Sequence, residues 1–225
     1  MPDWVEPIAR YILTEGLPGT LYVSAIAVTG SALIGLVLGT LITIKFRPLQ
    51  GLIRLYVEVF RGLPILVTVF IVYFGLPSVA PRFEFGPLTS AAIALVVWGS
   101  AQVAEATRGA VQSIPNEQHE AASALGFGWV GRHRAVILPQ ALRRLLPPFV
   151  SLLVNIIQNS TLAAAIGGLE ILDAANRQNQ RLATFPPAGI GEIHAAEIFG
   201  GVAVLFFLIS FPLTRLAAVL EKRLV

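Results

Sequence analysis

A short polar stripe inside an apolar stretch holds the side chains best suited to contact a polar solute. Asn155, Gln158 and Asn159 occupy positions i, i+3 and i+4, and Ser160 and Thr161 follow directly. A helix places the three amides on one face, and polar groups within a membrane span face protein or water rather than lipid. Two interpretations remain open: this polar stripe lines a path for a solute, or it joins helices by hydrogen bonds.

The other residues capable of chemistry do not form a recognisable catalytic or metal site. Cysteine is absent, which excludes disulfides, thiolate catalysis and cysteine metal ligands. The three histidines are scattered, and the polar stripe contains no nucleophile with a neighbouring base. We therefore expect neither catalytic residues nor metal ligands in this chain.

The pattern of a nucleotide site is missing as well. A phosphate-binding loop needs a lysine after glycine at the start of a helix, whereas the two lysines follow Ile44 and Glu221. If ATP drives this protein, a separate subunit must hydrolyse it. The chain itself is expected to bind no cofactor.

Two pairs of opposite charges lie three residues apart near the ends of apolar segments. Glu58 precedes Arg61, and Glu105 precedes Arg108. Each pair can meet on one face of a helix, which lowers the cost of placing charge at a membrane edge. We interpret both pairs as structural rather than catalytic.

The composition is that of a membrane protein. Of 225 residues, 55% are hydrophobic and only 13% are charged, with a mean hydropathy of +0.74. Soluble domains are nearer a quarter charged. The net charge of +3 is modest, and no basic face with interleaved aromatic residues indicates nucleic-acid binding.

Apolar periodicity predicts an all-α membrane protein in a single domain over residues 1–225. A helix rises about 1.5 Å per residue, so about 20 residues cross a bilayer core of about 30 Å. Residues 1–19 are amphipathic and suit an interfacial helix, and residues 170–196 form a polar segment. Five transmembrane helices are predicted, at about 21–44, 56–76, 88–107, 149–168 and 198–220.

Basic residues predict the orientation of these spans. The side that receives the C-terminus is rich in lysine and arginine, whereas Arg10, Arg82, Arg177 and Arg181 on the other side are diluted by acidic residues. The positive-inside rule places the N-terminus outside and the C-terminus in the cytoplasm, so residues 170–196 are predicted to be extracytoplasmic. The cytoplasmic basic residues are then Lys45, Arg47, Arg54, Arg132, Arg134, Arg143, Arg144, Lys222 and Arg223.

The segment between the third and fourth spans is too polar to cross a bilayer and predicts two short helices. Asn116 can cap the first helix, and Gly126 can end it in the left-handed region. A second helix can begin at Trp129, with Pro139 kinking or ending it. Two short helices joined at a glycine are typical of a docking surface.

The motif Glu120-Ala121-Ala122, followed after three residues by Gly126 and after nine more by Val136 to Pro139, resembles the EAA loop of ABC importer permeases. Valine stands at 136 where isoleucine is usual. Three further stretches resemble the polar amino acid permeases of the histidine/glutamine/arginine type, and the likeness covers nearly the whole chain from Thr20. They are Tyr56 to Pro64, Ala104 to Gly109 and Pro115 to Ala122.

The resemblance implies a type I ABC importer permease in the bacterial cytoplasmic (inner) membrane, surrounded by lipid. A coupling segment, residues 109–147, would fit a groove on a dimer of cytoplasmic ATPase subunits that carry ATP and Mg²⁺. A second permease subunit would complete the pathway, and an extracytoplasmic binding protein would deliver the amino acid. The implied coupling residues are Glu120, Ala121, Ala122, Leu125, Gly126, Leu138 and Pro139.

The chain departs from the family pattern at the polar stripe. Relatives usually carry Lys-Asp-Thr-Ser-Leu where this sequence has Gln158-Asn159-Ser160-Thr161-Leu162. Either the chain is the non-binding half of a heterodimer, or its pocket prefers another side chain. The amino acid is left open, and so is the choice between a homodimer and a heterodimer. Two alternatives remain: an ABC permease for another solute such as methionine, or an ion-coupled carrier or channel.

Overall fold

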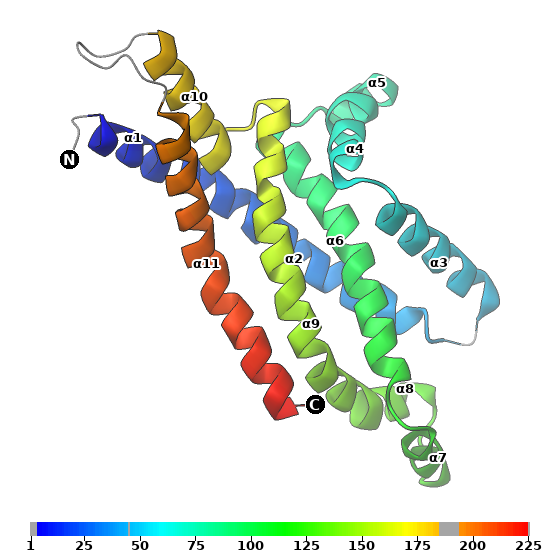
Figure 1. Ribbon diagram of the computed structural model, residues 1–225. Helices are drawn as coiled ribbons and strands as arrows, with labels where there is room; N and C mark the ends of the chain where they lie inside the picture. The colour runs from blue at the N-terminus through cyan, green and yellow to red at the C-terminus, as the bar shows by residue number, and fades with distance from the viewer. Residues whose placement is uncertain (1–3, 45, 185–193, 225) are drawn as a thin grey trace. The chain divides into compact units, whose positions relative to one another are not determined.

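A computed structural model describes residues 4–44, 46–184 and 194–224, which form helices joined by short turns without any β-strand (Figure 1). Lys45, which was predicted to be cytoplasmic, lies outside the described residues. So do residues 185–193 of the predicted extracytoplasmic segment. The principal helices are α1 (Val5–Tyr11), α2 (Leu17–Leu41), α3 (Arg47–Gly62), α4 (Ile65–Phe70), α5 (Leu76–Val79), α6 (Pro87–Gln112), α7 (Asn116–Ala124), α8 (Trp129–Arg132), α9 (Leu138–Asn159), α10 (Ile171–Thr184) and α11 (Ala195–Leu224).

Four helical runs among the described residues are long and apolar enough to cross a membrane. A fifth span results if α3 and the helices α4 and α5 are counted as one broken span. The structure therefore confirms an all-α membrane protein with four to five spans. The four unbroken runs are Val5–Leu41, Pro87–Gln112, Trp129–Ile166 and Ala195–Arg223.

The prediction of a continuous second span over residues 56–76 is wrong. Helix α3 begins earlier, at Arg47, and ends at Gly62, and α4 begins at Ile65. Leu63 is extended, with φ −80° and ψ 139°. The ring of the following Pro64 disfavours the helical conformation at Leu63, so one apolar stretch becomes two helices.

The boundary predicted near residue 19 is not a helix end. Helix α1 continues through a π-helical turn, Ile12–Gly16, directly into α2. One helical run therefore extends from Val5 to Leu41. The placement of residues 1–19 in the membrane interface stays a prediction.

Three prolines lie inside one helical run, so the alternative that Pro139 ends its helix is wrong, and the predicted kink there stays a prediction. The run extends from Trp129 to Ile166 and contains Pro147 and Pro148 within α9. A π-helical turn, His133–Ile137, precedes Pro139. Such local adjustments of the helix satisfy the backbone groups that a proline leaves without a partner. The coupling segment is thus continuous with the following span.

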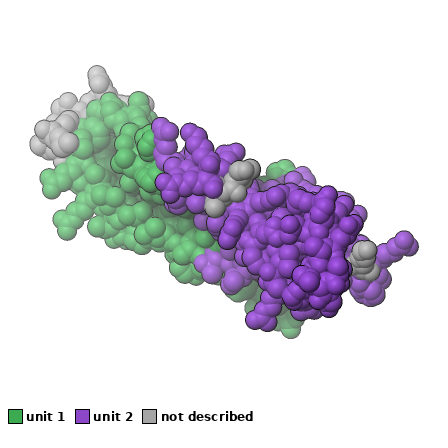
Figure 2. Space-filling model, turned by 90° about the horizontal axis from the view of Figure 1, so that it is seen from below, with its two compact units in different colours: residues 1–28, 64–96, 155–212 green, residues 29–63, 97–154, 213–225 purple. Residues whose placement is uncertain are grey.

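The chain divides into two compact units, which Figure 2 shows in different colours. Unit 1 contains residues 1–28, 64–96 and 155–212, and unit 2 contains residues 29–63, 97–154 and 213–225. In unit 2, α2 packs closely on α6 through two glycines. A methyl group on Gly35 would lie 2.5 Å from the Val103 Cβ, and one on Gly39 would lie 2.4 Å from the Ala104 oxygen. Only a residue without a side chain permits this approach.

In unit 1, the beginning of α10 packs on the beginning of α2 around a buried carboxyl group. Glu170 is fully buried, and its Oε1 accepts a hydrogen bond from the Asp173 amide at 2.8 Å, which caps α10. The Thr20 hydroxyl lies 3.5 Å from Glu170 Oε2 and accepts the Ile171 amide at 3.1 Å. Burial raises the pKa of Glu170 to about 7.

Candidate functional site

Helix α7 of the coupling segment ends in a turn that requires glycine. Gly126 has φ +85°, and its amide donates to the Ser123 oxygen at 3.0 Å. The Phe127 amide donates to the Ala122 oxygen at 3.1 Å. These two bonds make a Schellman motif, so the predicted bend at Gly126 is present. The predicted cap by Asn116 is wrong, because Pro115 occupies the cap position and Asn116 lies within the helix.

The tip of the coupling segment exposes apolar side chains. Leu125 is 77% exposed, Val130 69% and Phe127 40%. Beside this tip patch (Leu125, Phe127 and Val130), Glu120 is exposed and forms no hydrogen bond or ion pair with another described residue. Ala122 is buried, so of the two alanines in the motif only Ala121 is exposed. An exposed apolar patch of this kind is typical of a surface that contacts a protein or a membrane.

Behind the tip patch, the coupling segment is anchored to the membrane helices of unit 2. Ile137 is fully buried and packs in one apolar cluster with Ile114 and Ala141. Arg132 donates to the Ser123 hydroxyl at 2.8 Å, which ties α8 to α7. Packed side chains therefore connect the coupling segment to α6 and α9.

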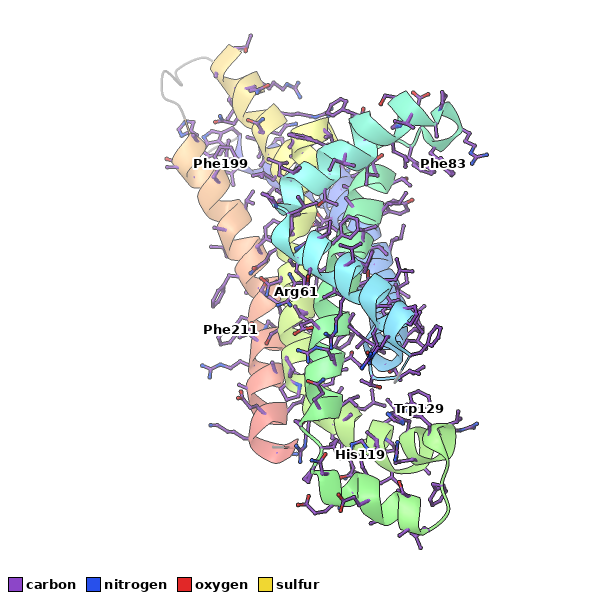
Figure 3. The ribbon with its side chains drawn as sticks, turned by 90° about the vertical axis from the view of Figure 1, so that its right-hand side faces the viewer. Arg61, Phe83, His119, Trp129, Phe199 and Phe211 are labelled. Atoms are coloured by element: carbon purple, nitrogen blue, oxygen red, sulfur yellow. The ribbon has the colours of Figure 1, made fainter. Side chains whose placement is uncertain are left out.

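His133 is a structural residue of this segment that the sequence pattern did not single out. It is 4% exposed and stacks on Trp129 with ring centroids 4.0 Å apart, and Figure 3 labels Trp129 and the nearby His119 in this segment. Its Nδ1 lies 2.9 Å from the Trp129 oxygen, and its Nε2 lies 3.5 Å from the Thr43 hydroxyl. The sequence did indicate this stacking in one way: Trp129 and His133 are four residues apart, which places them on one face of a helix.

The polar stripe lies in unit 1, where α9 gives way to a 3₁₀ helix, Ser160–Ile166. The Ser160 hydroxyl donates to the Ile157 oxygen at 2.7 Å, and the Thr161 hydroxyl donates to the Gln158 oxygen at 2.8 Å. Gly167, with φ +79°, ends the 3₁₀ helix. The 3₁₀ stretch therefore forms the C-terminal end of the helical run, where such turns are frequent.

The amides of the stripe differ in their contacts. The Gln158 side chain donates to the Ser210 hydroxyl of α11 at 3.4 Å, a bond between helices. Asn159 donates to the Asn155 backbone oxygen at 2.7 Å, within its own helix. Asn155 and Gln158 are exposed in the isolated chain and Asn159 is half-buried. Within a membrane, such a surface must be covered by protein or water.

Of the two predicted ion pairs, one is present and the other is replaced. Arg108 donates to both carboxylate oxygens of Glu105, at 2.9 and 2.6 Å. Arg61 lies 3.7 Å from Glu105 and donates to Gln102 at 3.3 Å, rather than pairing with Glu58. The buried Val57, one turn before Arg61, sets the packed face of α3, and Glu58 stays exposed. The described residues contain no cluster that could hold a metal ion.

Known proteins resemble this chain over nearly its whole length. A family model described as "Binding-protein-dependent transport system inner membrane component" matches residues 31–225. The glutamine transport system permease protein GlnP of Escherichia coli (strain K12) is 35% identical over 213 residues, covering 95% of this chain and 93% of GlnP. The probable glutamine ABC transporter permease protein GlnM of Bacillus subtilis (strain 168) is 32% identical over 211 residues, covering 93% and 92%.

A solved structure of an amino acid transporter also resembles this chain. The crystal structure of an amino acid ABC transporter with histidines has a TM-score of 0.83 and 25% identity, and the match covers 99% of each chain. The chain belongs to the family of binding-protein-dependent transport system inner membrane components. It is a multi-pass inner-membrane protein with the type I ABC permease fold, and the resemblance inferred from the sequence motifs is confirmed.

Proposed function

We propose that this chain is the transmembrane subunit of an ATP-driven importer of polar amino acids. It forms half of the translocation pathway and couples to a dimer of cytoplasmic ATPase subunits, which bind ATP and Mg²⁺. The observation that carries the proposal is the exposed tip patch at Leu125 and Val130, beside the bend at Gly126 and backed by the buried Ile137. The names of the relatives, which are glutamine and amino acid permeases, support the solute class.

In this proposal the coupling segment works as a lever. ATP draws the two ATPase subunits together and with them the tip patches of the two permease subunits. Because Ile137 is packed against α6 and α9, the displacement is passed to the membrane spans instead of being lost within a loop. The pathway then opens to the outside, where an extracytoplasmic binding protein delivers the amino acid.

The polar stripe is the proposed contact with the solute. Asn155 and Asn159 can both donate and accept hydrogen bonds, and neither carries a charge. An uncharged stripe favours a neutral polar side chain over a cationic one, because no carboxylate is present there to pair with a cation. If the chain served another solute, its extracytoplasmic binding protein would bind that solute instead of a polar amino acid. Family membership does not favour an ion-coupled carrier.

The distribution of basic residues supports an outside N-terminus and a cytoplasmic C-terminus. This orientation places the tip patch on the side of the ATPase subunits. It places α10, with Arg177 paired to Asp173 at 2.6 Å, on the side of the binding protein.

Gly126→Val tests the lever directly. Valine is strained at φ +85°, so the turn that presents Leu125 should be lost. In proteoliposomes containing the complete transporter, we expect uptake to fall at least about tenfold while membrane insertion is kept. Gly128→Val is the matched control, because Gly128 has φ −67° and open space around it. Normal uptake by Gly126→Val would contradict the proposal.

A further inference from the structure

A single cavity of about 490 Å³ in unit 1 is lined by the end of one helical segment and by the loop that leads into α6. The helical segment contributes Tyr73 and Phe74, which lie in a π-helical turn, Ile71–Gly75. The loop contributes Glu84 and Phe85. The described lining thus combines three aromatic rings with one carboxylate, and no residue of the polar stripe takes part in it.

Two of the aromatic rings form adjoining parts of the cavity wall. The ring planes of Tyr73 and Phe74 stand at 72° to each other, with centroids 4.7 Å apart. Tyr73 packs against an apolar cluster that includes Val72 and Ala91, which fixes its position. Phe74 is 61% exposed. The faces of aromatic rings carry partial negative charge and attract cations.

The loop that carries Glu84 and Phe85 is held in place by hydrogen bonds. The Glu84 amide donates to the Pro81 oxygen at 3.2 Å. The Ser90 hydroxyl donates to the Phe85 oxygen at 3.2 Å, and the Ser90 amide donates to the Gly86 oxygen at 2.9 Å. Because Ser90 is fully buried at the start of α6, this part of the cavity wall is anchored to that helix.

The carboxylate of Glu84 is not neutralised by the chain. Glu84 is exposed and forms no hydrogen bond or ion pair with another described residue. The nearby Arg82 lies over the ring of Phe83, 4.9 Å from its centroid, and Figure 3 labels Phe83. No lysine, arginine or histidine stands among the described residues that line the cavity. The cavity therefore presents a negative charge beside aromatic rings.

We propose that this cavity binds an organic cation through its guanidinium or primary ammonium group. The group donates charge-assisted hydrogen bonds to Glu84 and contacts the rings of Tyr73 and Phe85. A metal ion does not suit the site, because the described residues contain no cluster of metal ligands. The cation can come from a soluble molecule such as arginine or from the headgroup of phosphatidylethanolamine, and the same chemistry recognises both.

Equilibrium dialysis of the purified full-length chain in a neutral maltoside detergent, with arginine and with citrulline, tests the proposal. Citrulline has nearly the shape of arginine but carries no charge on its side chain. We expect arginine to bind at least about tenfold more tightly, since a cation–π contact and a charge-assisted hydrogen bond supply that discrimination. Equal binding of the two molecules would overturn the proposal.

Substitutions in the cavity locate the bound arginine. Glu84→Gln and Phe85→Leu should each weaken its binding by about tenfold. Glu15→Gln changes an exposed carboxylate outside the cavity and should have no effect on binding. Asn159→Leu should also leave binding unchanged, which separates this cavity from the proposed solute contact. Thermal unfolding confirms that each variant is folded, and unchanged binding in both Glu84→Gln and Phe85→Leu would overturn the proposal.

Added lipid separates the two sources of the cation. If the headgroup of phosphatidylethanolamine occupies the cavity, this lipid should compete with arginine, whereas phosphatidylglycerol, which has no ammonium group, should not. Arginine binding that neither lipid reduces would assign the cavity to a soluble cation. Equal competition by the two lipids would contradict the proposal, because the cavity would then be covered by lipid whatever the charge of its headgroup.

Discussion

The coupling segment and the polar stripe belong to one helical run, from Trp129 to Ile166, but they are held in place in different ways. The coupling segment is fixed by apolar packing around Ile137 and by an α7 cap that only glycine accommodates. The polar stripe is held by hydrogen bonds from Ser160 and Thr161 to backbone oxygens at the end of α9, and by a bond from Gln158 to Ser210. The proposed lever is thus held by apolar packing, and the proposed contact with the solute is held by hydrogen bonds.

The largest loss of stability should follow from truncating Ile137, whose packing holds the proposed lever in place. Ile137→Ala leaves a cavity in a fully buried cluster and should lower the free energy of unfolding by about 2–5 kcal/mol. Denaturant unfolding of the purified chain measures this loss. Leu142→Ala is the control, because Leu142 is 45% exposed. Equal losses in the two variants would mean that Ile137 is not an anchor.

The free energy of unfolding should depend on pH through Glu170, which follows the polar stripe in the sequence. The folded state raises the pKa of Glu170 from 4.5 to about 7. The stabilisation from binding this proton is therefore complete below pH 4.5 and is lost as the pH rises through 7, a change of about 3 kcal/mol. Glu170→Gln keeps an acceptor for the Asp173 amide and removes the titration.

We expect the free energy of unfolding to fall between pH 5 and pH 8 in the wild-type chain, with a much smaller change in Glu170→Gln. Glu84→Gln, a change at an exposed carboxylate, should leave the wild-type profile intact. Identical profiles for the wild type and Glu170→Gln would show that the buried carboxyl does not control this dependence.

Within the polar stripe, Asn159→Leu should reduce amino acid uptake by about tenfold or change its selectivity, because a solute would lose an amide partner. The hydrolysis of ATP stimulated by the binding protein should continue, since the lever is intact. Uptake of labelled amino acids into proteoliposomes measures the change. Normal uptake with normal selectivity would leave the stripe with a packing role only.

The smallest effect should come from Gln158→Leu. This change removes the 3.4 Å bond to Ser210, which corresponds to about 1 kcal/mol of stability at most. We expect a small shift in thermal unfolding and little change in uptake. A loss of uptake as large as that of Asn159→Leu would assign Gln158 to the pathway as well.

The sequence predicted the coupling segment better than the path of the chain through the membrane. The spacing of Glu120, Gly126 and Pro139 indicated the motif, and the positive φ of Gly126 follows from local geometry alone. Proline was a poor guide elsewhere. Pro64 breaks its apolar stretch, whereas Pro139 follows a π-helical turn inside a continuous run.

Contacts between distant residues could not be predicted from one sequence. Glu170 meets Thr20 across 150 positions, and no periodic pattern links the two residues. The partner of Arg61 was misassigned for the same reason, because a neighbour on the same helix was visible in the sequence and Glu105 on another helix was not.

A single cysteine tests the central claim most directly, because the chain has none of its own. Leu125→Cys in the assembled transporter should cross-link to the ATPase subunit, with a yield that changes when ATP is bound. Val79→Cys, 86% exposed and predicted to lie outside, should not cross-link to it. No cross-link from Leu125→Cys, or labelling of it only from the outer side of the membrane, would contradict the account.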